Sequence, residues 1–99
     1  MTKIAFHPEA DEEMVASAGF YEYRVEGLGL KFLYEIEAAL KHIARNPYGW
    51  PVKTENARCY LLHRFPFGLL YQVYTDHIYI LAVMHLHREP AYWKHRLKS

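Results

Sequence analysis

The sequence predicts an α+β fold in which a hairpin of two antiparallel helices packs on one face of a small, mainly antiparallel sheet. Apolar residues recur every three or four positions in the first half of the chain and every second position in the second half. With 99 residues, of which 52% are hydrophobic, the chain has enough apolar surface for one core but not for two. We therefore expect one domain over residues 1–99.

The chain is expected to begin with a strand and a helix. The apolar run KIAF (3–6) stops at His7, and Pro8 with the acidic residues behind it suits the start of a helix. One face of this helix is apolar and consists of Ala10, Met14, Ala18, Tyr21 and Val25. The spacing is that of an amphipathic helix with one buried face.

A second helix is expected after Gly27 and Gly29, which end the first one. Its apolar face consists of Leu33, Ile36, Leu40 and Ile43, with Phe32, Ala39 and Ala44 beside them. The segment RNPYGWP (45–51) ends this helix, because asparagine, glycine and proline interrupt helical structure. The short glycine linker predicts a helical hairpin.

Three strands are expected in the second half: CYLLHRF (59–65), FGLLYQVY (67–74) and HIYILAVMHL (77–86). The last strand is apolar on both faces. One face would carry Ile78, Ile80, Ala82 and Met84, and the other Tyr79, Leu81 and Val83. Such a strand suits the interior of a sheet and needs a second neighbour, for which the segment 3–6 is free. The expected order is therefore β-α-α-β-β-β.

Charge and composition exclude several classes of protein. Eight acidic and five basic residues give positions 1–49 a net charge of −3, whereas seven basic and three acidic residues give positions 50–99 a net charge of +4. An anionic partner would therefore meet the second half. Cys59 is the only cysteine, so no disulfide forms within the chain and a buried thiol is expected. No apolar run is long enough for a membrane span, and we expect a cytoplasmic protein.

The sequence lacks the common cofactor and nucleophile motifs, including GxGxxG, the P-loop and GxSxG. His85 and His87 alternate at the end of a strand and could bind a metal with His63 or His95 as third ligand. No carboxylate stands at a suitable spacing beside them. We therefore predict neither a metal nor a cofactor.

Two other kinds of site remain open from the residue types alone. In RNA cleavage, His85, His87 or Tyr92 would move protons, while arginines would hold the phosphate; the candidates are Arg58, Arg64 and Arg88. In a protein interface, the anchors would be Arg88, Tyr92, Trp93 and Arg96, since aromatic residues and arginine dominate binding hot spots. Trp93 could equally fill the open end of the core.

The sequence resembles the RelE/ParE superfamily of bacterial toxins. The resemblance is carried by RCYLLHRFPFGLLYQV (58–73) and IYILAVMHLHREPAYWKHRL (78–97). Family members share a basic strand, a strand with a Y-x-V motif, a hydrophobic strand and a basic segment with Arg-x-Pro and an aromatic residue. The matching residues here are Arg58, Arg64, Tyr71-Gln72-Val73, positions 78–84, Arg88-Glu89-Pro90 and Tyr92-Trp93. The resemblance spans nearly the whole chain and implies the same element order.

The resemblance implies a cytoplasmic toxin of a type II toxin–antitoxin module, which acts in growth regulation and plasmid stabilisation. A cognate acidic antitoxin would hold the toxin inactive by wrapping a segment over its sheet and helices, in keeping with the basic second half. The assembly could be a homodimer or a heterotetramer with the antitoxin. Neither the antitoxin's identity nor the toxin's activity follows from the sequence.

Two activities divide this superfamily, and the resemblance favours the ParE-like one, which poisons DNA gyrase. The gyrase- or antitoxin-binding residues would be Arg58, Arg64, Arg88, Tyr92, Trp93 and Arg96. The alternative is a RelE-like, ribosome-dependent endoribonuclease that cuts mRNA, with Arg64, Arg88 and Tyr92 at the scissile phosphate and His85 or His87 as proton carrier. Ribonuclease members usually carry arginine where this chain has Gly68, and Lys53 is the only lysine of the preceding loop. A further alternative is a decayed toxin that only binds its antitoxin.

Overall fold

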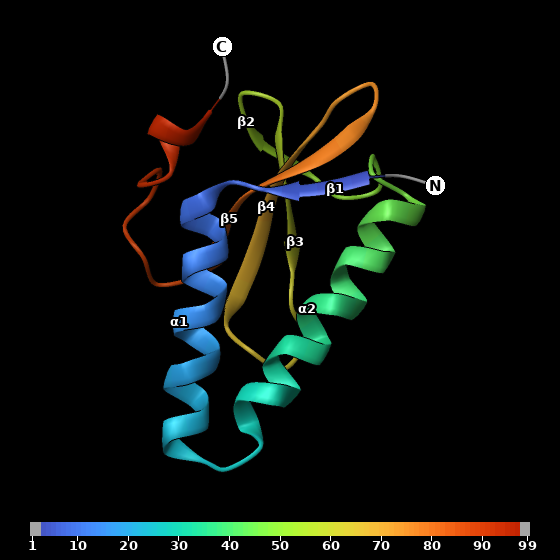
Figure 1. Ribbon diagram of the computed structural model, residues 1–99. Helices are drawn as coiled ribbons and strands as arrows, with labels where there is room; N and C mark the ends of the chain where they lie inside the picture. Colours follow the sequence, from blue (N-terminus) through green and yellow to red (C-terminus); the bar gives the residue numbers. More distant parts are fainter. Residues whose placement is uncertain (1–2, 98–99) are drawn as a thin grey trace.

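Two helices stand against one face of a five-stranded sheet (Figure 1). The computed structural model describes residues 3–97. The elements are β1 (Lys3–Phe6), α1 (Pro8–Arg24), α2 (Leu28–Arg45), β2 (Val52–Thr54), β3 (Ala57–Leu61), β4 (Phe67–Val73), β5 (His77–His85) and the short 3-10 helix η1 (Lys94–Arg96). The predicted element order and fold class are confirmed, with one more strand, β2, in the loop after α2.

The strands follow the order β1-β5-β4-β3-β2 across the sheet. β1 runs parallel to β5, with Lys3 opposite His77 and Phe6 opposite Ile80, and all other pairs are antiparallel. The apolar last strand thus lies inside the sheet between β1 and β4, as its composition predicts. β3 is shorter than the predicted strand 59–65, because residues 62–66 form the turn that leads into β4.

α1 begins at Pro8, as predicted, and His7 is its N-cap, whose Nδ1 accepts the Glu9 N–H at 3.0 Å. The start of the second helix differs from the prediction. The linker consists of residues 25–27 and ends at Gly27, with a left-handed φ of 83°, and α2 already begins at Leu28. Gly29 therefore lies inside α2, where a Cβ would collide with the carbonyl oxygen of Ala18. Its missing side chain lets the two helices approach closely.

The buried face of α2 is rotated from the predicted one. The buried side chains are Phe32, Ile36, Ala39 and Ile43. Leu33 is 36% exposed, Leu40 is only partly buried, and Val25 beyond α1 is exposed. Both stripes have helical spacing, and contact with the sheet decides which of them is buried.

A β-bulge changes the faces of β5. Leu70 pairs with Ala82 while the next residue, Tyr71, pairs with Ile80, so Leu81 is an extra residue. Ile78, Ile80 and Val83 consequently face the helices, whereas Leu81 and Ala82 pack in the cluster on the other face, with Met84 against it. The predicted alternation holds through Leu81 and is wrong from Ala82 on.

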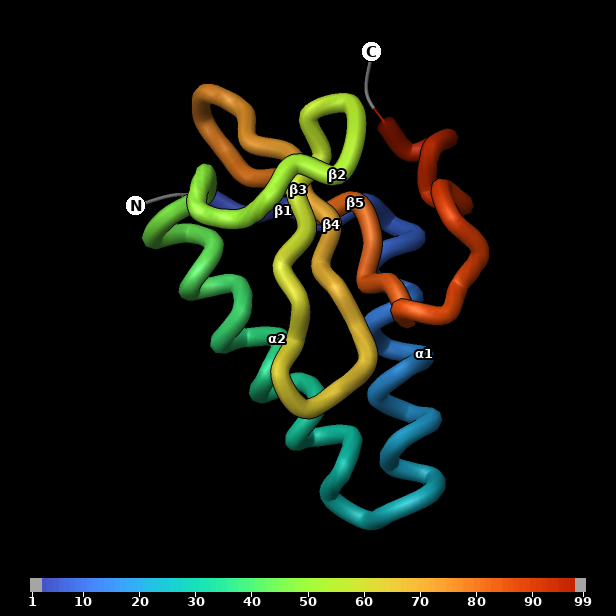
Figure 2. The backbone as a smooth tube through the Cα atoms, turned by 180° about the vertical axis from the view of Figure 1, so that it is seen from behind, coloured from blue at the N-terminus to red at the C-terminus, as the bar shows by residue number. Residues whose placement is uncertain are grey.

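The C-terminal segment 86–97 runs beside β5 and α1 (Figure 2), and side chains of this segment pack on the second face of the sheet. Trp93 is 4% exposed and packs in a cluster with Ala57, Cys59, Leu70, Leu81 and Ala82. Cys59 is buried, as expected, and burial raises the pKa of its thiol. No helix within residues 3–97 is long and apolar enough to cross a lipid bilayer.

Candidate functional site

One end of the sheet gathers most of the candidate residues. Phe67 at the start of β4 pairs with His85 at the end of β5, and the Leu86 N–H donates to the Pro66 carbonyl at 2.9 Å. The β3–β4 turn and the chain after β5 therefore lie side by side. We call this region the basic end and define it by His63, Arg64, His85, His87 and Arg88.

Aromatic rings pack directly beside the basic end. Tyr21 of α1 and Phe32 of α2 meet Phe65 and Phe67, with ring centroids 4.9 Å apart for Tyr21–Phe65 and 5.0 Å apart for Phe32–Phe67. We call these four residues the aromatic cluster. It joins the helical hairpin to the β3–β4 turn and buries all its members except Tyr21, which stays half-buried.

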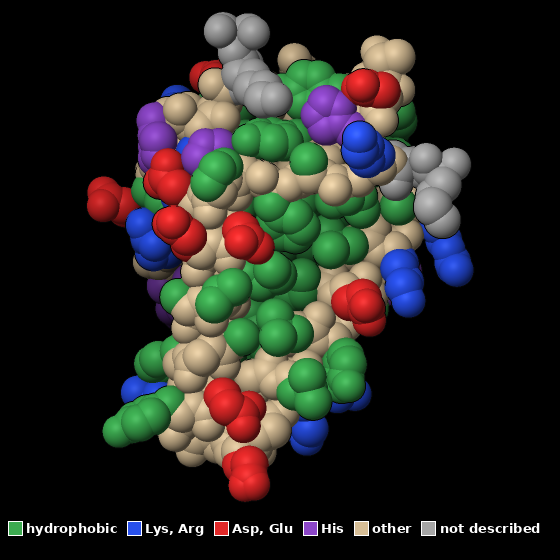
Figure 3. All heavy atoms as spheres, in the orientation of Figure 1, with side chains coloured by type: hydrophobic (Ala, Val, Ile, Leu, Met, Phe, Trp, Pro, Cys, Tyr) green, Lys and Arg blue, Asp and Glu red, His purple; other side chains and the backbone are tan. Residues whose placement is uncertain are grey.

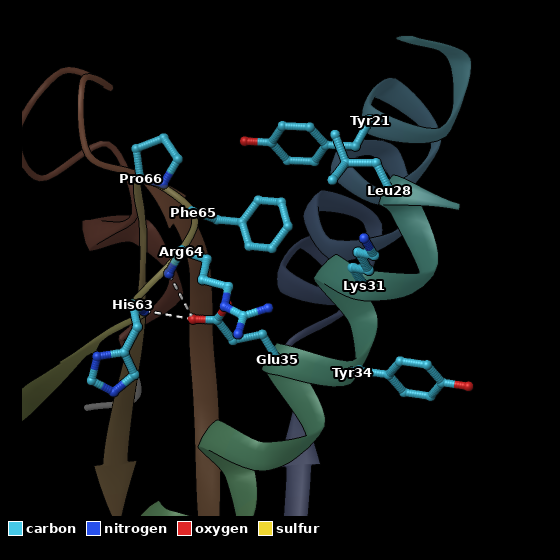
Figure 4. A pocket seen from close by; sticks show the side chains of 9 residues that line it. All are labelled: Tyr21, Leu28, Lys31, Tyr34, Glu35, His63, Arg64, Phe65 and Pro66. Atoms are coloured by element: carbon cyan, nitrogen blue, oxygen red, sulfur yellow. Dashed lines mark hydrogen bonds between the residues drawn. The ribbon is translucent and has the colours of Figure 1, made fainter. Parts of the chain in front are cut away.

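Two hollows flank Tyr21. The larger has a volume of about 930 Å³ and lies between the helices and the turn (Figure 4). It is lined by Tyr21, Leu28, Lys31, Tyr34, Glu35, His63, Arg64, Phe65 and Pro66. The smaller, of about 360 Å³, is lined by Glu13, Ala16, Ser17, Phe20, Tyr21, Phe67, Val83, His85 and Arg88. Each hollow thus combines apolar walls with cationic side chains.

Glu35 fixes the β3–β4 turn against α2. Its Oε2 accepts the backbone N–H groups of both His63 and Arg64, the latter at 3.0 Å (Figure 4). Within residues 3–97, the Arg64 side chain makes no hydrogen bond and no ion pair. Arg64 therefore places a guanidinium without an ion pair beside the larger hollow, which the Glu35 carboxylate also lines.

Arg88 is the exposed cation beside the smaller hollow. Its guanidinium lies 3.8 Å from the centroid of the Tyr92 ring, and the Tyr92 hydroxyl donates to Glu13 Oε2 at 2.8 Å. Burial first, and then the hydrogen bond to Glu13, raise the pKa of Tyr92 far above its ordinary value. Tyr92 therefore keeps its proton at neutral pH and cannot serve as a general base.

Arg96 is part of the core rather than of an exposed binding surface. It is 6% exposed, its two terminal nitrogens donate to Glu13 at 3.0 and 2.8 Å, and one of them also donates to the Leu81 carbonyl at 3.0 Å. Trp93 is buried as well, in keeping with its predicted role as a core plug. Neither side chain is available for a partner in this conformation.

Arg58 lies away from the basic end. It pairs with Tyr71 in the middle of the sheet, and its guanidinium donates to the carbonyls of Tyr48 and Trp50 at 3.2 and 2.7 Å. These bonds hold the loop after α2. Of the predicted arginines, only Arg64 and Arg88 come together at the basic end.

The two adjacent histidines contact each other and the aromatic cluster. The His87 N–H donates to His85 Nδ1 at 3.1 Å, and the His85 ring lies 5.1 Å from that of Phe67. His95, the suggested third metal ligand, instead places Nε2 3.0 Å from Glu9 Oε2. Within residues 3–97, no group of three or more His, Cys, Asp or Glu is arranged to hold a metal ion.

Sequence reasoning missed Glu13, Lys31 and the aromatic cluster as parts of the site. In the sequence, Glu13 is one of several acidic residues near the start of a helix, and Tyr21 is one residue of the apolar helix face. Their roles depend on contacts with residues far along the chain. The helical hairpin also exposes large apolar side chains that its sequence pattern does not single out: Val15, Phe20, Tyr23, Leu30 and Tyr34. Figure 3 shows apolar side chains along the space between the helices and acidic ones over the start of α1.

The chain is a small α+β domain with a basic, partly aromatic end, and comparison with known proteins gives its class. A solved structure described as "Chromosomal ParDE TA system from P. aeruginosa" aligns with 87% of this chain and 97% of its own, with a TM-score of 0.71 and 23% identity, and so shares the fold. A comparison with curated proteins found no match.

A family model described as "ParE toxin of type II toxin-antitoxin system, parDE" matches residues 4–90, which is most of the chain. The protein therefore belongs to the ParE toxin family of type II toxin–antitoxin systems.

Proposed function

We propose that the protein inhibits growth by binding and poisoning DNA gyrase through its basic end, and that a cognate acidic antitoxin neutralises it. The observation that carries this proposal is the combination of two exposed arginines without an ion pair, Arg64 and Arg88, with an aromatic cluster between two hollows. Exposed arginine beside aromatic residues is typical of binding surfaces. The cytoplasm, where gyrase acts on bacterial DNA, is the compartment that this function requires.

The geometry favours binding over RNA cleavage. The Tyr92 hydroxyl is engaged with Glu13, and a side chain at Gly68 would meet Cys59 Sγ, so the arginine of ribonuclease relatives has no room there. Removing one such donor from a catalytic phosphate site costs about 2.7–4 kcal/mol of transition-state stabilisation. A surface that only binds needs neither group.

The antitoxin is expected to cover the larger hollow and the helical hairpin. The hollow has apolar walls from Tyr21, Leu28 and Phe65, and Lys31 and Arg64 add positive charge to it. An amphipathic segment with acidic residues at its edges would fit this surface, because its apolar face would fill the hollow while its carboxylates meet the cations. The exposed apolar side chains of the hairpin would be covered in the same complex.

The test uses purified toxin freed of its antitoxin, in gyrase supercoiling and cleavage-complex assays. We expect inhibition at micromolar concentration, weakened about tenfold by Arg88→Ala. Arg45→Ala is the matched control, since Arg45 is exposed at the far end of α2. Unchanged supercoiling and cleavage-complex levels with wild-type toxin would sink the proposal.

Two further outcomes identify the alternatives. New 5′ ends in translated messages, found by primer extension and lost with Arg88→Ala, would make the protein an endoribonuclease. Overexpression without any growth defect would identify a decayed toxin that only binds its antitoxin.

A further inference from the structure

Glu13 of α1 joins three parts of the fold through a single carboxylate. Oε1 accepts the Val83 N–H and one Arg96 nitrogen, both at 3.0 Å. Oε2 accepts the Tyr92 hydroxyl and the other terminal Arg96 nitrogen, both at 2.8 Å. The side chains of Glu13 and Arg96 are 16% and 4% exposed. A carboxylate with four donors in a site this dry has a fixed position.

The Glu13 carboxylate lies beside β5, where backbone groups beyond the end of β1 require hydrogen-bond partners. β1 ends at Phe6, opposite Ile80, so β5 continues without a neighbour on that side. Arg96 donates a hydrogen bond to the Leu81 carbonyl, and Glu13 accepts one from the Val83 N–H. The two side chains thus satisfy backbone groups that a longer β1 would have paired.

A stack of side chains extends from this buried pair to the surface. Two guanidinium groups contact the Tyr92 ring, with the Cζ of Arg96 5.0 Å and the Cζ of Arg88 3.8 Å from the ring centroid. Arg88 itself is exposed. The stack therefore begins at a fixed, buried ion pair and ends at a cation that a partner can reach.

Nothing else in the described chain holds the Arg88 guanidinium. Within residues 3–97, this side chain makes no hydrogen bond and no ion pair, and its guanidinium makes a cation–π contact with the Tyr92 ring. The surrounding segment has no regular structure between His85 and Lys94 and includes a left-handed residue, Ala91, with φ of 63°. The place of Arg88 thus depends on the place of Tyr92.

The hydrogen bonds of Glu13 also affect whether the positive charge of Arg88 is free to meet a partner. Both residues line the smaller hollow, so the carboxylate could neutralise Arg88 if it were free. Its oxygens are instead occupied by Arg96, Tyr92 and Val83. Arg96 pairs with Glu13 and also lies 3.6 Å from Glu9 Oε1, so the Glu13 carboxylate is engaged inside the protein while Arg88 stays without an ion pair.

We infer that Glu13 is a positioning residue, which fixes the Tyr92 ring and thereby holds the Arg88 cation over the smaller hollow for an anionic group of the target. The inference rests on the proposed role of the basic end in target binding. It adds that a half-buried residue of α1, remote in sequence from the basic end, sets the affinity of that surface.

The first part of the test measures only the position of the Arg88 side chain relative to the Tyr92 ring. The Tyr92 ring current should shift the Arg88 side-chain protons upfield in the NMR spectrum of the wild-type protein. We expect Tyr92→Leu to abolish this shift, and Glu13→Gln and Tyr92→Phe to reduce it by at least half. Unchanged Arg88 shifts in both of the latter variants would overturn the inference, whatever the protein does to gyrase.

The second part measures the consequence as a double-mutant cycle. Tyr92→Phe keeps the ring and removes only the bond to Glu13, so it serves even if Glu13→Gln does not fold. We expect it to weaken gyrase inhibition about threefold to tenfold, with little further effect in an Arg88→Ala background. Equal losses in both backgrounds would mean a merely structural role. If wild-type toxin does not inhibit gyrase, the proposed function fails while the NMR part still tests the positioning.

Discussion

Gly68 of β4 lies so close to Cys59 of β3 that a Cβ at position 68 would come within 2.8 Å of the Cys59 Sγ. Both residues are buried. The contact explains in packing terms why position 68 carries no side chain. Any side chain at this position would require the Cys59 side chain or β3 to shift.

Gly68→Ala should lower the free energy of unfolding by about 1–3 kcal/mol, the usual cost of overpacking a close contact. Urea denaturation at constant protein concentration measures the change. In a Cys59→Ala background the added methyl group meets no sulfur, so the same substitution should cost clearly less. The same loss in both backgrounds would show that the thiol is not the obstacle.

The order of the elements could be predicted because each signal is local. The change of apolar period from 3.6 to 2, Pro8 behind His7 and the glycine at position 27 act within a few residues of chain. The apolar character of 77–86 even predicted that β5 needs β1 as a second neighbour, and the pairing confirms it. The resemblance to the family was carried by these same strands.

The parts that sequence reasoning missed depend on distant contacts. The bulge at Leu81 contains no glycine or proline from which it could be predicted. It places Ala82 and Val83 on the opposite sheet faces from those predicted. Glu13 and Arg96 are 83 positions apart, so no spacing rule connects them. Arg96 therefore looks like a surface anchor in the sequence, and Trp93 fits either an anchor or a core plug, whereas the folded chain buries both.

The stability of the protein should fall between pH 10 and pH 12. Burial raises the pKa of Tyr71 from 10.0 to about 12, and its hydroxyl donates to the Pro47 carbonyl at 2.6 Å. Because the folded state holds this proton more tightly, the stabilisation is complete below pH 10 and is lost as the pH rises through 12. For this fully buried residue, the loss amounts to about 2–3 kcal/mol.

Urea denaturation at pH 8, 10 and 11, with absorbance at 295 nm to follow phenolate formation, measures this loss. Tyr71→Phe removes the titrating group, so its stability should fall less steeply over the same range. Tyr92, whose pKa is also raised, contributes to the slope that remains. A Tyr71→Phe protein with the wild-type slope would contradict the assignment.

Trp93→Ala should lower the free energy of unfolding by about 3–5 kcal/mol, since it empties the centre of the cluster on the second sheet face. Loosening of segment 86–97 should make it a site of limited proteolysis. Trp93→Phe keeps much of the packing and should restore both resistance and gyrase inhibition. If Trp93→Ala melts like wild type and yet loses target binding, Trp93 is an exposed anchor after all.

Arg64→Glu should slow association with the antitoxin about tenfold at low salt, because it reverses the charge of a side chain without an ion pair beside the larger hollow. The charge lies on an exposed turn, so the effect should shrink as ionic strength rises and the screening length falls to about 8 Å at 0.15 M. Dissociation should change little, because rim charges act mainly on the approach of the partner. Surface plasmon resonance at two salt concentrations separates the two rates. Lys41→Glu, an equal charge change at an exposed position of α2 outside both hollows, is the control, and an equal loss there would mean that net charge alone governs the encounter.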